Sequence, residues 1–194
     1  CLDAPKGRYI LSLDYSAQEY LVLAILSGDH KMINNFKNGV DPHTATAYII
    51  WGEENYDRQK RKKAKAANFL QNYMGGAHTL AKNLNIPVEE AEHIIDMYEK
   101  GFWECIQWKK NSIRTCIEKQ DGVCYTWFGR PRQFKSRLTT AADLLDIGLR
   151  GGSNGIAAKS YSAKGNGMIK AVERRIVSHL IQSTCGDICR WDLI

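Results

Sequence analysis

The sequence lacks any long hydrophobic run. No stretch of about 18 apolar residues occurs in it, so it predicts no transmembrane helix. Residues 1–7 contain no hydrophobic core of the kind found in secretory signal peptides. We therefore expect a soluble, cytoplasmic protein that has no membrane partner.

Paired cysteines of the metal-binding type are also absent. No two of the six cysteines form a Cys-x-x-Cys pair. Cys185 and Cys189 lie one helical turn apart, but no neighbouring His or Cys would complete a zinc site. Because free cysteine behaves as a small hydrophobic residue, the pattern favours buried thiols in reducing surroundings.

A phosphate-binding glycine motif is missing as well. Residues 151–167 contain five glycines among Ser, Asn and Lys, without the fixed spacing and the Lys-Ser or Lys-Thr of a P-loop. This composition favours a flexible linker. The chain has 194 residues and ordinary globular usage, 44% apolar and 25% charged, which predicts one core or two incomplete lobes.

Basic residues are abundant and unevenly distributed. The net charge is +6 and the sequence pI is about 9.0. Six cations fall within eight positions: Arg58, Lys60, Arg61, Lys62, Lys63 and Lys65. Such a block favours a polyanionic partner. A solvated helix face explains the block equally well, and composition does not separate the two.

The segment from Asp14 to Glu19 is typical of a carboxylate at the end of a strand. Residues 8–13 are predicted to form an apolar strand, and residues 21–26 provide an apolar helical face. A carboxylate placed there can hold Mg²⁺ in phosphoryl-transfer enzymes. The structural alternative is a capping box, in which Ser16 caps the helix and Glu19 reaches back to it.

The rest of the chain is predicted to be rich in helices. Asp41 and Pro42 form a helix start, with a cap followed by proline at the first helical position. A small hairpin is expected where Gly129 makes a turn after a strand over residues 123–127. We expect an α+β, helix-rich fold with helices over residues 31–38, 42–51, 54–73, 87–101, 102–119 and 168–194.

Within the basic helix, one pattern recurs every four residues: Arg61, Lys65, Phe69 and Tyr73. Successive members are about 40° apart around the helix, so neighbours share a face. Arg61 and Phe69 are about 12 Å apart along the axis, a length that suits a triphosphate and its nucleoside. The alternative is a solvated basic face with two core aromatics. His43 could likewise be a capping or core residue, or a donor to phosphate.

Together these residues resemble family A DNA polymerases. Five segments match in order across most of the chain: Leu13-Asp14-Tyr15-Ser16 to Gly28-Asp29, Asp41-x-His43-Thr44-x-Thr46-Ala47, Arg61-x3-Lys65-x3-Phe69-x3-Tyr73, Trp127-Phe128-Gly129-Arg130-x-Arg132, and Glu173-Arg174 to Gln182-Ser183-Thr184. The resemblance implies part of a right-hand polymerase. Its divisions would be a palm strand and first catalytic motif over 1–28, fingers over 29–135, a variable connection over 136–167 and a palm helix over 168–194.

For the metal site and sugar, the resemblance implies three roles. Asp14 would be one of two carboxylates that bind two Mg²⁺ ions, with the carbonyl of Tyr15 as a further ligand. Those ions would activate the primer 3′-hydroxyl and stabilise the leaving pyrophosphate. Glu19 would pack under the sugar and reject a ribose 2′-hydroxyl. The enzyme would be a DNA-directed DNA polymerase of replication or repair, nucleoid-associated or phage-encoded in a bacterial host.

For the nucleotide and the DNA, the resemblance implies roles for seven further residues. The triphosphate of a dNTP would be held by Arg61, Lys65 and His43, with Lys65 also catalytic. Phe69 would stack beside the incoming nucleotide, and Tyr73 would sit near the templating base. Primer-template DNA would be contacted in the minor groove by Arg174 and Gln182.

Several departures from the family pattern stand out. Leu70 replaces the Gly usual after Asn-Phe, and Tyr73-Met74-Gly75 replaces Tyr-Gly-Met, so the end of the basic helix is expected to bend differently. Leu21 stands where the family usually has Arg. The second metal-binding Asp, in a His-Asp-Glu turn, would lie beyond Ile194, and the thumb would precede the first motif. We expect the chain to be inactive without those segments as partners.

Two rival functions remain open. A non-catalytic nucleic-acid-binding remnant of a polymerase would bind DNA in a salt-sensitive way without catalysis. A single-subunit RNA polymerase shares the first Asp and a Lys-bearing helix, but Glu19 disfavours it because a ribonucleotide enzyme must accept the 2′-hydroxyl.

Overall fold

The structure is a computed structural model that describes residues 4–9, 14–134 and 163–191. Residues 10–13 of the predicted strand over residues 8–13, and most of the glycine-rich connection, lie outside these ranges. None of the helices in the described ranges is long and apolar enough to cross a membrane.

Helices dominate the described residues, as the sequence predicts. The first half contains α1 (Gln18–Ser27), α2 (His30–Lys37), α3 (Pro42–Trp51), α4 (Arg58–Asn72), α5 (Ala77–Leu84) and α6 (Val88–Gly101). The second half contains α7 (Trp103–Arg114), the π-helical turn η1 (Thr115–Lys119), β1 (Val123–Tyr125), β2 (Pro131–Gln133), α9 (Ala163–Ser178), the π-helical turn η2 (His179–Ser183) and α10 (Thr184–Trp191).

Aspartate caps fix the starts of three consecutive helices. The side chains of Asp29, Asp41 and Asp57 accept hydrogen bonds from the third residue of α2, α3 and α4. The predicted capping box at α1 is wrong. Ala17 is the N-cap residue, with φ of 53° and no side-chain cap, and Glu19 bonds elsewhere.

Several predicted boundaries are corrected. The basic helix begins at Arg58 rather than at 54, because Asp57 is extended and caps it. The first hairpin strand ends at Tyr125, since Thr126 donates its N–H to the Arg130 carbonyl across the turn. The final helix begins at Ala163, five residues before the predicted start, and contains a π-helical turn. The helix α5 was not predicted.

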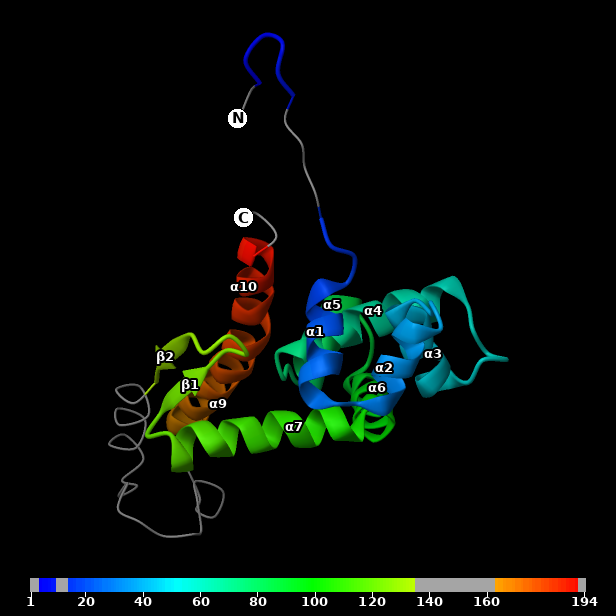
Figure 1. Ribbon diagram of the computed structural model, residues 1–194. Helices are drawn as coiled ribbons and strands as arrows, with labels where there is room; N and C mark the ends of the chain where they lie inside the picture. Colours follow the sequence, from blue (N-terminus) through cyan, green and yellow to red (C-terminus); the bar gives the residue numbers. More distant parts are fainter. Residues whose placement is uncertain (1–3, 10–13, 135–162, 192–194) are drawn as a thin grey trace.

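The hairpin itself is confirmed, as an antiparallel pair in which Cys124 opposes Arg132. Figure 1 shows α7 running beneath the molecule, between the group α2–α6 and the hairpin with α9. The main core lies where α1, α7, α9 and η2 meet, and a smaller core joins α3 to α6. Four of the cysteines are buried free thiols: Cys105, Cys116, Cys124 and Cys185. This confirms the expectation of buried thiols at these four positions.

Candidate functional site

The four-residue repeat lies along the solvent side of α4. Beside this row the helix is buried at Ala64, Ala67 and Asn68, of which Ala67 belongs to the smaller core. Phe69 is 53% exposed, which excludes the alternative that it is a core aromatic. The helix therefore presents Arg61, Lys65 and Phe69 to solvent in one row, with Tyr73 as its C-cap residue.

Arg61, at the N-terminal end of the row, is held by the residue that caps α3. Its Nε donates to Asp41 Oδ2 at 3.0 Å and its Nη2 to Asp41 Oδ1 at 3.1 Å. The same carboxylate accepts from the backbone N–H and the hydroxyl of Thr44, each at 2.9 Å. Burial alone would raise the pKa of Asp41, but Arg61 and Thr44 hold it below its usual value.

His43 lies beside this ion pair, in the first turn of α3. Its Nδ1 is 2.9 Å from Asn68 Nδ2, which makes Nδ1 the acceptor of this bond. Asn68 is buried, and its Oδ1 accepts from Thr46 at 3.0 Å. Because the amide fixes the acceptor nitrogen, Nε2 of neutral His43 carries the proton and can donate to an anion.

The aromatic and cationic groups of this end lie close together. The rings of His43 and Phe69 have centroids 5.9 Å apart, and Lys65 Nζ lies 5.7 Å from the Phe69 centroid. Burial lowers the pKa of His43, Asp41 opposes this, and Arg61 and Lys65 lower it further. The structure thus brings the side chains of Arg61, Lys65, His43 and Phe69 into one region, and phosphate binding there stays a prediction.

At the other end of α4, three residues from distant elements meet. The Tyr73 hydroxyl donates to Glu19 Oε2 on α1. Gln182, in η2, donates through Nε2 to the Tyr73 oxygen at 3.0 Å and to Glu19 Oε1 at 3.3 Å. Burial, followed by the bond to Glu19, raises the pKa of Tyr73 above its usual range. The phenol is therefore protonated at neutral pH and acts as a donor.

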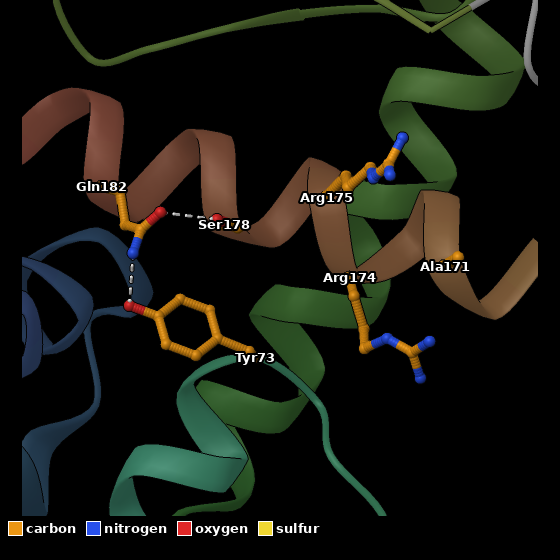
Figure 2. Close-up of a pocket in the computed structure, with 6 residues that line it drawn as sticks. All are labelled: Tyr73, Ala171, Arg174, Arg175, Ser178 and Gln182. Carbon is orange, nitrogen blue, oxygen red and sulfur yellow. Dashed lines mark hydrogen bonds between the residues drawn. The ribbon is translucent and has the colours of Figure 1, made fainter.

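A pocket of about 390 Å³ opens beside this junction. It is lined by Tyr73, Arg174, Arg175, Ser178 and Gln182, with Ala171. Figure 2 shows the Tyr73 phenol reaching Gln182, whose Oε1 accepts from Ser178 at 2.9 Å. The side chains of Arg174 and Arg175 point in opposite directions from α9 (Figure 2). The pocket thus pairs a cation with hydrogen-bonding groups, which suits phosphate and base edges.

Asp14 and Tyr15 lie before the first helix. Both are exposed, in the irregular segment that precedes α1. The described residues contain no group of three His, Cys, Asp or Glu side chains able to hold a metal ion. One exposed carboxylate does not provide the ligands that Mg²⁺ requires, so the described residues alone do not fit the predicted two-metal site.

The altered sequence at the end of α4 has a structural explanation. Met74 adopts φ of 56°, Gly75 N–H donates to the Leu70 carbonyl at 3.0 Å, and Met74 N–H to Gln71 at 3.2 Å. These are the bonds of a Schellman cap. A Cβ at Gly75 would lie 2.2 Å from Leu70 Cδ1. In this conformation, Leu at position 70 therefore favours Gly at position 75, which couples the two departures.

Lys109 of α7 also bonds to the C-terminal end of α4. Its side chain is 1% exposed, and Nζ donates to the Gln71 carbonyl at 2.6 Å. Burial lowers the pKa of Lys109. No motif or periodicity in the sequence marks Lys109, Asn68 or Ser178. Asn68 follows Arg61 by seven residues, which is only about 20° around a helix, so helical spacing did not indicate that Asn68 is buried.

The sequence comparisons agree with this architecture. The profile of DNA polymerase family A matches residues 1–194. Similar proteins include the DNA polymerase of Mycobacterium phage D29, 43% identical over 53% of this chain and 17% of its own length. DNA polymerase I of Thermus aquaticus is 38% identical over 66% of this chain and 16% of its own length. DNA polymerase I of Lactococcus lactis is 30% identical over 82% of this chain and 20% of its own length.

A solved structure shares the fold. The POL domain of Pol1 from M. smegmatis, in a complex with DNA primer-template and dNTP, superposes with a TM-score of 0.68 and 25% identity. The match covers 91% of this chain and 27% of that one. The fold is thus that of one part of a polymerase POL domain. The chain belongs to DNA polymerase family A, and it spans about a fifth or less of the length of the curated relatives described above.

Proposed function

We propose that this chain forms the fingers and part of the palm of a DNA-directed DNA polymerase. The observation that carries the proposal is the exposed row on α4, which runs from Arg61 to a junction of Tyr73, Glu19 and Gln182. A triphosphate at the cationic end would leave its sugar and base at the aromatic end. The reaction is transfer of a dNTP to a primer 3′-hydroxyl.

Each residue of the row has one role in this proposal. Arg61, Lys65 and His43 bind the triphosphate, and Lys65 stabilises charge on the phosphates during transfer. Phe69 stacks beside the incoming base. The Lys65–Phe69 distance of 5.7 Å supports this placement, because the ammonium and the ring border the same space.

The junction at the other end recognises the sugar and the template. Glu19 lies under the deoxyribose and excludes a 2′-hydroxyl, and Tyr73 borders the templating base. Arg174 and Gln182 line one pocket with Tyr73, which supports a role in contacting primer-template DNA. Residues 1–28 and 168–194 would belong to the palm and residues 29–135 to the fingers, with the connection over 136–167 between them.

The metal site belongs to the complete enzyme in this proposal. Asp14 supplies one carboxylate and Tyr15 one carbonyl to a site for two Mg²⁺ ions, which the remaining polymerase segments complete. The segments that contain the thumb and the second catalytic carboxylate are therefore the expected partners of this chain. The bacterial and phage relatives favour action on DNA inside a bacterial host.

Primer extension tests the proposal. This chain, joined to or mixed with the remaining segments of its polymerase, should extend a primer with dNTPs and Mg²⁺. Asp14→Ala should abolish extension, whereas Asp96→Ala, on the exposed surface of α6, should not. Extension that survives Asp14→Ala would remove Asp14 from the metal site. No extension from the complete mixture would favour the DNA-binding remnant.

The choice of sugar separates the RNA polymerase alternative. Wild type should prefer dNTPs, and Glu19→Ala should gain incorporation of ribonucleotides. If this variant gains none in an active assembly, the role of Glu19 in sugar selection is wrong. Preference of the wild type for rNTPs would favour the RNA polymerase.

A further inference from the structure

One carboxylate connects the two helices that carry the proposed triphosphate ligands. Asp41 caps α3, whose second residue is His43, and it also holds Arg61 of α4. The sequence places Asp41 only as a helix cap. In the structure its Oδ2 accepts from Thr44 N–H, Thr44 Oγ1 and Arg61 Nε, and its Oδ1 accepts from Arg61 Nη2.

The edge of the Arg61 guanidinium that contacts Asp41 determines whether Arg61 can bind a phosphate at the same time. The pair uses the Nε–Nη2 edge of the guanidinium. The Nη1–Nη2 edge then presents a second pair of donors in the fixed fork that suits a phosphate. A carboxylate on one edge and a phosphate on the other can therefore bind Arg61 together.

Thr44 holds the carboxylate of Asp41 in place, so Asp41 can in turn hold the side chain of Arg61 in place. The Thr44 bonds tie Asp41 to the first turn of α3, and that turn also carries His43, whose Nδ1 meets Asn68 of α4. Arg61 has a long side chain that is only partly covered, and without Asp41 it would sample many rotamers. We propose that Asp41 is a positioning residue that pre-orders Arg61 for the triphosphate; this inference rests on the proposed function.

Two effects of Asp41 oppose each other. Its negative charge repels a nearby triphosphate, but the pair is partly exposed, and charge interactions at exposed sites are weak. Pre-ordering a side chain that would otherwise be immobilised on binding raises affinity by a factor of about 3–10. The second effect dominates at moderate ionic strength, so Asp41 strengthens binding although its charge is unfavourable.

Asp41→Asn separates the positioning role from the cap. Asparagine caps helices as well as aspartate does, so α3 should remain intact. Dissociation of dATP in the presence of Mg²⁺ would be measured by calorimetry on the whole chain at physiological salt. We expect Asp41→Asn to weaken binding about 3–10-fold, with an unchanged unfolding midpoint. The control Asp96→Asn makes the same change of charge at an exposed pair with Lys100 and should leave affinity within about twofold.

A double-mutant cycle shows whether Asp41 acts through Arg61. Lysine cannot form the two-edged fork, so Asp41→Asn should have no effect in an Arg61→Lys background. Equal weakening in both backgrounds, or tighter binding by Asp41→Asn, would overturn the inference. If Arg61→Lys weakens binding and Asp41→Asn does not, the proposed function stands and only the inference fails. If neither wild type nor any variant binds dATP, the nucleotide site and the inference both fall.

Discussion

The two ends of α4 are held in different ways. From Arg61 to Asn68 the helix is attached to α3 by an exposed ion pair and one buried amide, between residues 20 and 25 positions apart in the sequence. Its C-terminal end contacts α7, α1 and η2 through partners 38, 54 and 109 positions away. The first end is therefore open to solvent, and the other end is bonded to several distant elements.

Removing the buried lysine should produce the largest change and sharpen this contrast. Lys109→Ala leaves a cavity beneath the end of α4, so we expect a loss of about 2–4 kcal/mol in the free energy of unfolding. Lys110→Ala, at the exposed neighbouring position, should change it by less than about 0.5 kcal/mol. Urea denaturation measures both. Equal effects of the two variants would show that Lys109 does not anchor the helix.

Lys109→Met then separates volume from charge. Methionine fills much of the same space without a cation, and replacing a buried charge by an apolar group is often nearly neutral. We expect it to recover most of the loss. A loss as large as that of alanine would instead assign the stability to the bond with the Gln71 carbonyl.

The exposed row on α4 could be predicted from the sequence better than the C-terminal end of this helix. The four-residue spacing of Arg61, Lys65 and Phe69 fixes their common side, because helical geometry is local. The cap at Asp41 was equally readable. Its second role was not, since the bond to Arg61 depends on how α3 packs against α4. The tertiary contacts of Lys109 have no periodic signature at all.

The junction at Tyr73 is intermediate: its residues could be predicted from the sequence, but the bonds between them could not. Family resemblance identified Glu19, Tyr73 and Gln182 separately, and nothing in their spacing predicts that they bond to one another. The capping box failed for the same reason: Glu19 has a better partner in Tyr73 than in the backbone at Ser16. The local capping-box pattern therefore predicted the wrong partner for Glu19, which bonds instead to a residue from a distant segment.

The Leu70–Gly75 pair provides the second largest expected effect. Gly75→Ala places a Cβ against Leu70, so it should destabilise the protein by about 1–3 kcal/mol. In a Leu70→Ala background the same change should cost clearly less, because the obstructing side chain is gone. Chemical denaturation of the four proteins completes the cycle. Additive effects would refute the coupling between these two departures from the family pattern.

Tyr73→Phe tests the contacts of the junction at a smaller cost. It removes the hydroxyl that joins Glu19 and Gln182, and we expect a loss of about 1 kcal/mol in stability. Tyr48→Phe on α3, away from the junction, is a comparison for removing a phenolic hydroxyl. A loss no greater than that of this control would mean that the hydroxyl does not hold the junction together.

The smallest expected effect is a pH dependence from His179, which lies one turn before Gln182 in η2. Its Nδ1 is 2.9 Å from Ser183 Oγ, and Nε2 is buried without a partner among the described residues. Burial lowers the pKa of His179, the backbone groups of Arg130 and Cys124 oppose this, and the charges of Arg132 and Arg130 lower it further. The unfolded chain, with the usual value of 6.5, therefore binds a proton before the folded chain does.

Because the folded-state pKa is the lower one, stability is complete above about pH 6.5 and falls as the pH drops through that value toward the lowered one. His179→Gln should flatten this slope in thermal unfolding between about pH 7.5 and 5.5. His43→Gln should flatten it too, since burial also lowers the pKa of His43. His78→Gln, at an exposed position, should leave it unchanged. If His179→Gln keeps the wild-type dependence of stability on pH, His179 makes no contribution to it. His43, at the other end of α4, would then be the histidine responsible.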